Sequence, residues 1–251
     1  MDLYTEPSRQ IEIAGAYNLR DIGGYTTRDQ RRTRWRTLLR SASLHRLTRD
    51  SWHTLRGHGV RMIIDLRRTS ETGYDGYLVD ETVDMRYQHI PLFDDDLYEV
   101  VDKPARNLDE LYRLLLDNCS TQFVAVLRAI AAQDSAPALI HCAVGKDRTG
   151  LAIALALGVA GVDDATIADD YALSSALLEP IFEEFRAYER ANGGDMQRLE
   201  NMLLSERDTM LRTLAYLNAH YGGINAYLSR AGMAEAELVG LHALLVEKER
   251  P

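Results

Sequence analysis

The sequence predicts an α/β fold, built on a central, mostly parallel sheet that is flanked by helices. Two observations lead to this fold class. Short apolar runs of the buried-strand type alternate with helical stretches over residues 1–162. From Asp163 onward the pattern is almost entirely helical. We therefore expect a single domain over residues 1–251, with an α/β core at about 1–162 and an enlarged C-terminal helical part at about 163–251.

The individual elements are predicted from local patterns. The segment Leu108 to Ala132 has the spacing of one long amphipathic helix. Asp163 or Asp164 would cap the first helix of the C-terminal part. The glycine pairs at 193–194 and 222–223 would end two later helices. The predicted strands cover residues 34–39, 60–66, 87–92 and 138–142.

The composition limits the classes of function. The 251 residues include 29 Lys and Arg against 38 Asp and Glu, which gives a net charge of −9. We expect no nucleic-acid partner, because phosphate backbones favour a basic surface. Two cysteines cannot build a disulfide framework, and they favour a reducing compartment or thiol chemistry.

The sequence also predicts where the protein is found. Residues 1–6 have neither a basic start nor an apolar run, so no signal peptide is expected. The longest apolar stretch, Leu151 to Val162, is interrupted by Gly158 and Gly161 and is too short to span a bilayer. We therefore expect a cytoplasmic protein without a membrane span. Export without a leader would leave no sign in the sequence, and neither would an oligomeric state.

The most informative segment is the ten-residue loop His141-Cys142-Ala143-Val144-Gly145-Lys146-Asp147-Arg148-Thr149-Gly150. It lies between a predicted strand and a predicted helix, so its backbone N–H groups can form a nest for an anion at the N-terminus of the helix. This field should favour the thiolate form of Cys142. The planar fork of Arg148 can hold two phosphate oxygens. Together these parts indicate nucleophilic attack on phosphorus through a phosphocysteine intermediate.

Other interpretations of the loop fit less well. A lone cysteine at the end of an apolar strand is most often a small core residue, but here an arginine follows at the sixth position. A Walker loop would need a glycine at the place of Ile140 and Ser or Thr at the place of Asp147. No metal-binding spacing is present, so neither a metal nor a cofactor is expected. A rhodanese-like sulfurtransferase and a catalytically silent phosphate-binding module are weaker alternatives.

The loop resembles the Cys-x5-Arg signature of the protein tyrosine phosphatase superfamily. Its HCxxGKDRTG form is similar to that of the atypical bacterial tyrosine and lipid phosphatases. Further blocks along nearly the whole chain are similar to motifs of that family. They are residues 18–25, 39–41, 65–67, 169–174 and 226–245.

The resemblance implies roles for the loop residues. Cys142 would be the nucleophile, Arg148 the phosphate clamp, and Thr149 a hydrogen-bond donor to the Cys142 sulfur. For His141 two interpretations stay open, a positioning role behind the cysteine and a core histidine with a satisfied hydrogen bond. The backbone cradle would consist of Ala143, Val144, Gly145, Lys146, Asp147 and Arg148.

The sequence offers two candidates for the general acid. Family resemblance favours Asp147, inside the loop, whereas the segment from Pro91 to Asp96 resembles a separate acid loop and makes Asp95 the rival. Lys146 would add positive charge beside the phosphate and favour inositol headgroups, unless it is a surface lysine. The motifs also place two acid–arginine pairs near the site, for which ion pairing is the more common role than substrate contact. These supporting residues are Asp65, Arg67, Asp21 and Arg20.

The resemblance implies a hydrolase of phosphate monoesters that needs no metal. Phosphotyrosine proteins are the first expected substrate, followed by phosphoserine or phosphothreonine proteins and phosphoinositides. The alternative is a small-molecule phosphatase that acts on a sugar, nucleotide or biosynthetic intermediate, because the loop itself recognises only phosphate. Residues 179–212 are predicted to form either a lid over the site or a fixed helical layer. Cys119 is expected inside a helix, and the arginines between Arg28 and Arg40 on the solvated face of a strand pair.

Overall fold

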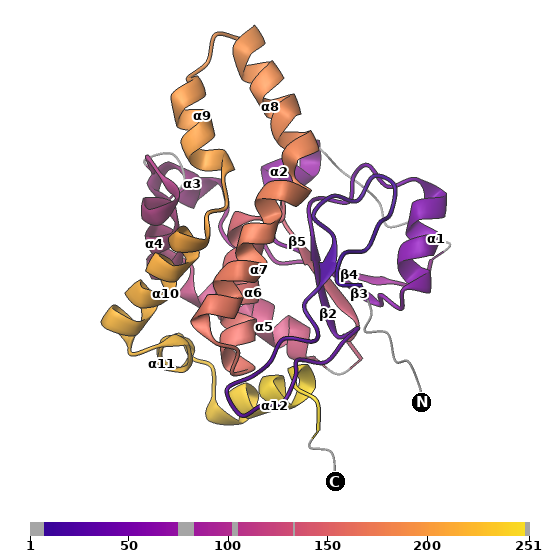
Figure 1. The fold of residues 1–251 in the computed structure, drawn as a ribbon, viewed down its shortest axis with the longest axis vertical. Coiled ribbons are helices and arrows are strands. Elements are labelled where there is room, and N and C mark those ends of the chain that lie inside the picture. Colours follow the sequence, from indigo (N-terminus) through magenta and orange to yellow (C-terminus); the bar gives the residue numbers. More distant parts are fainter. Residues whose placement is uncertain (1–7, 75–82, 102–104, 133, 249–251) are drawn as a thin grey trace.

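The computed structural model describes residues 8–74, 83–101, 105–132 and 134–248. Its centre is a five-stranded sheet with the strand order β1-β2-β5-β3-β4 (Figure 1). Only β1 is antiparallel to its neighbour, and the other pairings are parallel. This confirms the predicted fold class. The strands are β1 (Arg20–Asp21), β2 (Leu38–Ser41), β3 (Met62–Asp65), β4 (Arg86–His89) and β5 (Ala138–His141).

Helices cover both faces of the sheet. The first helices are α1 (Arg49–Gly57), α2 (Thr69–Tyr74), α3 (Asp95–Val101), α4 (Leu108–Asn118), α5 (Ser120–Ala131) and α6 (Asp147–Val159). The C-terminal helices are α7 (Asp164–Leu177), α8 (Glu179–Ala191), α9 (Met196–Leu203), α10 (Arg207–Tyr221), α11 (Ile224–Arg230) and α12 (Glu235–Leu245). The predicted helical C-terminal part is therefore confirmed.

Side chains alternate between the two faces of the sheet along each strand, so a hydrophobic core forms on each face. Ile63 and Leu139 point to the face that α1 covers, where they pack with Trp52 and Leu55. The residues on either side of them in the strands, such as Ile64 and Ile140, point to the opposite face and join the main core. This main core contains α6, in which every residue from Leu151 to Leu157 is buried. The cysteine loop is thus carried by a strand and a helix that are both fixed in the interior.

Three predicted elements have clearly different bounds in the structure. The strand predicted at 87–92 is β4 and ends at His89. The strand predicted at 34–39 is found at Leu38–Ser41, because Arg36 adopts a positive φ of 53° that is incompatible with extended backbone. The helix predicted from Leu108 to Ala132 is two helices, α4 and α5, which meet at a bend of 79°. Cys119 lies at the break, not inside a helix, and it is fully buried. No single helix of the described residues is long and apolar enough to span a membrane; only α4 and α5 taken together across this bend meet that criterion.

The C-terminal helices begin and end where local sequence signals place them. The Asp163 side chain accepts a hydrogen bond from the Thr166 N–H and caps α7. Gly222 ends α10 in the left-handed conformation, as predicted.

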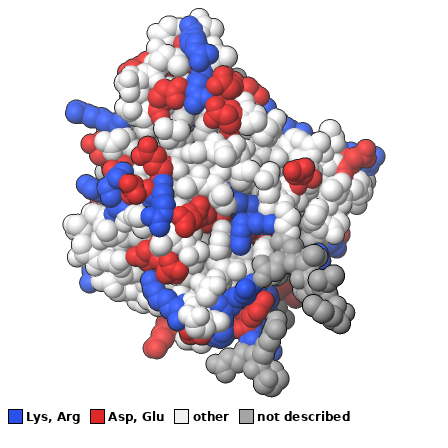
Figure 2. All heavy atoms as spheres, viewed as in Figure 1, with Lys and Arg blue, Asp and Glu red and all other residues white. Residues whose placement is uncertain are grey.

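Helices α8 and α9 form a hairpin that projects from the body of the molecule (Figure 1). Acidic and basic side chains are interspersed over the face shown in Figure 2.

Candidate active site

The cysteine loop lies at the carboxyl edge of the parallel strands. Ser41, His141 and Asp65 are aligned in register, each as the last residue of its strand. Cys142 follows directly, is 1% exposed, and is separated by four residues from the start of α6 at Asp147. Ligands of open α/β sheets bind outside this edge.

The peptide groups of the loop are held in one orientation by residues from outside it. Asn18 donates side-chain hydrogen bonds to the carbonyls of Val144 (3.3 Å) and Gly145 (3.0 Å). Arg40 also donates to the Gly145 carbonyl, at 2.7 Å. Gly145 has a φ of +68°, and a Cβ there would lie 2.0 Å from the carbonyl oxygen of Ser41. The loop therefore needs glycine at this position, both for its conformation and for its close approach to β2.

Asn18 and Arg40 bind the carbonyl oxygens of Val144 and Gly145 on one side of the loop. The N–H groups of the same peptides therefore face the opposite side. Within the described part of the chain, none of the backbone N–H groups of residues 143–148 donates a hydrogen bond to another protein group. The N-terminus of α6 points its dipole at the same place. Six adjacent donors without acceptors among the described residues, next to a cysteine, are able to bind the oxygens of a tetrahedral anion.

Arg148 is held by a carboxylate from α2. Its two terminal nitrogens donate to Glu71 at 2.6 and 2.8 Å. Burial alone would lower the pKa of Arg148, but the Glu71 carboxylate and the nearby Cys142 raise it above its ordinary value. Burial also acts on Glu71, where it raises the pKa of the carboxyl. The hydrogen bonds and charge of Arg148 have the larger effect and lower the pKa of Glu71 to about 2. The guanidinium is therefore charged and fixed in position beside the loop, with further N–H donors left for a ligand.

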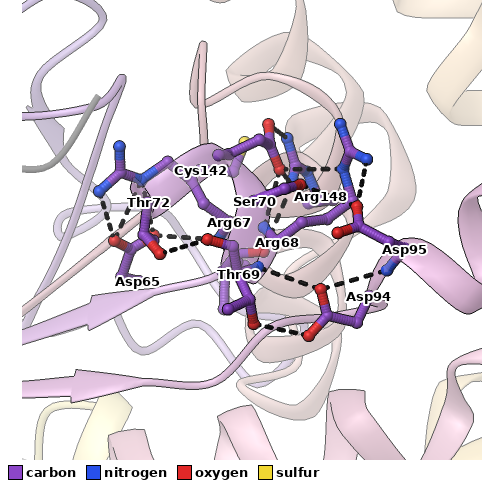
Figure 3. A network of polar contacts seen from close by, with 12 residues as sticks. Asp65, Arg67, Arg68, Thr69, Ser70, Thr72, Asp94, Asp95, Cys142 and Arg148 are labelled. Carbon is purple, nitrogen blue, oxygen red and sulfur yellow. Dashed lines mark hydrogen bonds and ion pairs between the residues drawn. The ribbon is translucent and has the colours of Figure 1, made fainter. Parts of the chain in front are cut away.

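The predicted rival acid Asp95 is engaged by α2. Its carboxylate accepts hydrogen bonds from Arg68 at 2.7 Å and Ser70 at 2.8 Å (Figure 3). The adjacent Asp94 accepts from both the backbone and the hydroxyl of Thr69. These contacts bind the 94–95 segment to the first turn of α2, and Asp95 does not line the cavity beside the loop.

Asp147 does line that cavity, which has a volume of about 230 Å³. Its Oδ1 atom accepts a hydrogen bond of 2.7 Å from the hydroxyl of Tyr112 on α4. Arg148 and side chains of α8 and α9, among them Phe182 and Met202, also line it. Of the two predicted acids, the structure thus brings Asp147 to the space next to the oxyanion site.

Lys146 is buried, so the interpretation as a surface lysine is wrong. The residue is 2% exposed, and its Nζ atom donates to the carbonyl oxygens of Met202 and Leu203 at the end of α9. The same atom lies 3.3 Å from Asp147 Oδ1. A lysine near a helix C-terminus complements the unpaired carbonyls there. Lys146 therefore connects the loop to the α8–α9 hairpin.

His141 and Asp65 form a buried layer behind the cysteine. Burial lowers the pKa of His141 to about 4, more than the nearby Asp65 carboxylate raises it, so the ring is neutral at neutral pH. Its Nδ1 atom lies 3.1 Å from the Cys142 carbonyl, which only accepts, so Nδ1 carries the proton. Asp65 pairs with Arg67 at 2.8 Å and accepts from Tyr87. The predicted pairing of Arg67 is confirmed, and His141 contacts the cysteine backbone.

Three other predictions of supporting contacts are wrong. Asp21 lies on the antiparallel strand β1, which carries it away from the carboxyl edge, and it accepts from the backbone N–H groups of Gly23 and Arg36. Arg20 consequently pairs with Asp170 and not with Asp21. The Thr149 hydroxyl is buried in the first turn of α6 and has no hydrogen-bond partner among the described residues, so it does not donate to the Cys142 sulfur.

Of the three buried charges beneath the loop, sequence reasoning named only Arg20 as a supporting residue, and it missed Arg40 and Asp170. Arg20 and Arg40 both pair with Asp170 on α7, at 3.1 and 2.7 Å, and all three side chains are at most 1% exposed. Arg40 was expected on a solvated face, but the Asp170 carboxylate compensates its charge in the interior. Asp170 lies in one of the blocks with family resemblance, which was the only signal available. The structure also adds Asn18, Glu71, Tyr112 and Tyr171 to the surroundings of the loop.

A metal site was not predicted. The described residues contain no group of three or more His, Cys, Asp or Glu side chains that could hold a metal ion.

Comparisons with known proteins show the family of this chain. The profile of the tyrosine phosphatase family matches residues 11–247. The chain is 34% identical over 215 residues to a tyrosine-protein phosphatase of Nostoc commune, covering 82% of this chain and 73% of the relative. It is 25% identical to the triple specificity protein phosphatase PtpB of Mycobacterium tuberculosis, covering 94% and 98%.

Solved structures were compared as well. The core catalytic domain of the PP-IP phosphatase SIW14 of S. cerevisiae is 15% identical with a TM-score of 0.42, covering 65% of this chain and 78% of that one. TpbA of P. aeruginosa is 17% identical with a TM-score of 0.42, covering 88% and 98%.

Proposed function

The chain belongs to the tyrosine phosphatase family and is a phosphoric monoester hydrolase, and on this premise we propose that Cys142 is its nucleophile. The observation that carries the proposal is the set of six loop amides, 143–148, which follow the cysteine directly and donate to no acceptor among the described residues. Three phosphoryl oxygens bind there, together with the guanidinium of Arg148. The positive N-terminal end of the α6 dipole is directed at the same place.

The first step transfers the phosphoryl group to the protein. The Cys142 thiolate supplies the electron pair of a new S–P bond, while the P–O bond to the leaving group breaks and its electron pair remains on that oxygen. Asp147 donates a proton to this oxygen, which leaves as an alcohol or phenol. Its position at the cavity next to the loop suits this role.

The second step reverses the proton transfer. The Asp147 carboxylate takes a proton from a water molecule whose oxygen attacks phosphorus. The S–P bond breaks, and its electron pair returns to Cys142 as the thiolate, which releases inorganic phosphate. Arg148 holds the equatorial oxygens in both steps, and Glu71 fixes its guanidinium plane.

For the substrate, we propose phosphotyrosine proteins first. The relatives support this order: one is named a tyrosine-protein phosphatase, and the other a triple specificity protein phosphatase. Phosphoserine or phosphothreonine proteins and phosphoinositides are further proposed substrates. A second phosphate on an inositol ring would compete with the α9 carbonyls for Lys146, so such substrates require movement of the hairpin.

The acid assignment is tested by comparing Asp147→Asn with Asp95→Asn. We expect Asp147→Asn to lower kcat/KM for phenyl phosphate, which has a poor leaving group, by about 10²-fold. The loss for p-nitrophenyl phosphate should be much smaller, because its leaving group needs little protonation. Asp95→Asn is the matched control, since Arg68 and Ser70 hold that carboxylate outside the cavity. A leaving-group-dependent loss in Asp95→Asn alone would transfer the role to Asp95.

We further propose that the α8–α9 hairpin is a lid on an otherwise single domain. The hairpin packs through a small apolar cluster of its own, which includes Phe182, Leu203 and, from the loop, Val144. The lid is shorter than the predicted range 179–212, because Met210 on α10 belongs to the main core. We place it at 179–203.

The two ends of this hairpin lie close together, which makes a deletion feasible. Ser175 and Ser205 are hydrogen-bonded through their hydroxyls at 2.8 Å. In a Cys119→Ser background, replacing residues 179–203 by a short Gly-Ser linker should accelerate iodoacetamide alkylation of Cys142 at least about tenfold. Tyr188→Ala, on the exposed side of α8, is the control and should leave the rate unchanged. An unchanged rate in the deletion would show that the hairpin is a fixed layer.

A further inference from the structure

A chain of buried hydroxyl groups ends on the carboxylate of Asp147. The hydroxyl oxygens of Tyr171 and Tyr112 lie 2.6 Å apart, and Tyr112 donates to Asp147 Oδ1 at 2.7 Å. The two rings meet edge to face, with centroids 6.0 Å apart. Tyr112 comes from α4 and Tyr171 from α7, and both are at most 1% exposed. This row of hydroxyls therefore reaches Asp147 from the interior of the protein, and neither tyrosine lines the cavity beside the loop.

The direction of these hydrogen bonds follows from the proton count. A tyrosine hydroxyl has one proton, and Tyr112 gives its proton to Asp147. Tyr112 must therefore accept from Tyr171. Burial, followed by the nearby Asp147 charge, raises the pKa of both tyrosines well above the ordinary value. Both hydroxyls are therefore protonated at neutral pH, where the donor and acceptor roles are as described.

Because Tyr112 donates its proton to Asp147, the two carboxylate oxygens of Asp147 are not equivalent. Oδ1 accepts from Tyr112 and lies 3.3 Å from Lys146 Nζ. Oδ2 takes part in no hydrogen bond to a described residue. An oxygen that accepts from a fixed hydroxyl and lies beside an ammonium group is unfavourable for a proton. When Asp147 is protonated, the proton is therefore on Oδ2.

The residues around Tyr171 fix the position of its hydroxyl. Gly150, in the first turns of α6, allows the Tyr171 ring to approach, since a Cβ there would lie 3.1 Å from the ring. The preceding residue, Asp170, is anchored by Arg20 and Arg40. The backbone at this point of α7 is thus held by the same buried charges that orient the loop.

We propose that Tyr112, supported by Tyr171, is a positioning residue that fixes Asp147 Oδ1 and presents Oδ2 with its proton to the leaving oxygen. The proposal rests on the proposed role of Asp147 as the general acid. It assigns to α4 and α7 a part in catalysis, although neither helix contributes a residue to the loop.

The test is Tyr112→Phe, which removes the hydroxyl and keeps the ring. We expect kcat/KM for phenyl phosphate to fall about tenfold and that for p-nitrophenyl phosphate less than about threefold, since only the first depends strongly on protonation of the leaving group. The matched control is Tyr227→Phe. Tyr227 is equally buried and donates to the Leu116 carbonyl of the same helix α4, but it does not contact Asp147. It should change neither value by more than about twofold.

A double-mutant cycle makes the test specific. In an Asp147→Asn background, Tyr112→Phe should cause no further loss with phenyl phosphate, because the hydroxyl acts only through the acid. Equal losses for both substrates, or the same loss with and without the Asp147 carboxyl, would overturn the positioning role. If Asp147→Asn lowers kcat/KM equally for both substrates, the assignment of Asp147 as the acid is wrong. If Asp147→Asn lowers it more for phenyl phosphate but Tyr112→Phe does not, only the positioning role of Tyr112 is wrong.

Tyr171→Phe provides a second, milder variant should Tyr112→Phe not fold. It retains the hydrogen bond from Tyr112 to Asp147 and removes only the one that Tyr112 accepts. The loss should again be larger for phenyl phosphate, at about threefold. An equal effect on both substrates would contradict the proposal in this variant too.

Discussion

A Cys142→Ser variant is expected to lose hydrolysis of p-nitrophenyl phosphate by at least about 10³-fold. The proposed S–P bond requires a sulfur nucleophile, and a serine hydroxyl at the same position is a much weaker one. The measurement is steady-state hydrolysis in the presence of EDTA. Wild-type activity should survive the chelator, because none of the proposed steps uses a metal ion.

The other cysteine provides the control for this experiment. Cys119 is fully buried between α4 and α5, and burial raises the pKa of its thiol to about 12. Cys119→Ser should therefore keep the wild-type activity. The Cys142→Ser protein should still bind a phosphotyrosine peptide, because the amides and Arg148 remain. Substantial hydrolysis by this variant, or loss of wild-type activity in EDTA, would contradict a cysteine mechanism.

The loop could be predicted from the sequence because its chemistry is local. A cysteine at the end of a strand, an arginine six positions later and a helix start between them are all contained in residues 138–150. The structure places these residues as predicted, with Cys142 directly after β5 and Arg148 in the first turn of α6. The order of strands and helices was predictable for the same reason, since hydrophobic periodicity is a property of short segments.

The supports of the loop could not be predicted, because they are long-range. Arg40 and Asp170 are 130 positions apart, and Arg20 and Asp170 are 150 apart. From the sequence, Arg40 belongs to a series of arginines of which most would face solvent. Only the fold shows that an acidic residue of α7 reaches it in the interior. The break at Cys119 is equally a tertiary effect, because the residues on both sides of it have helical spacing.

These buried charges lead to the second large effect, which concerns stability. An Asp170→Ala variant should lower the free energy of unfolding by about 3–5 kcal/mol, because it leaves the charges of Arg20 and Arg40 uncompensated in the interior. It also removes an acceptor from the Tyr25 hydroxyl. The measurement is urea denaturation at neutral pH, followed by circular dichroism.

The adjacent residue is a matched control. Asp169 forms an ion pair with Arg207 at 2.6 Å, but the two side chains are 63% and 43% exposed. Exposed pairs contribute little, so Asp169→Ala should cost less than about 1 kcal/mol. A similar small loss in both variants would mean that Arg20 and Arg40 are sufficiently stabilised by their other partners, which include the carbonyls of Asn18 and Gly145.

Comparison of Asp170→Asn with Asp170→Ala separates charge from hydrogen bonding. The asparagine keeps one oxygen that can accept from an arginine, but it has no charge to offset the two guanidinium groups. If compensation of charge is the main effect, the two variants should be destabilised to a similar extent. Because Arg40 also orients the Gly145 carbonyl, folded protein of either variant should bind phosphate more weakly. The stability of the core and the geometry of the oxyanion site thus depend on the same buried carboxylate.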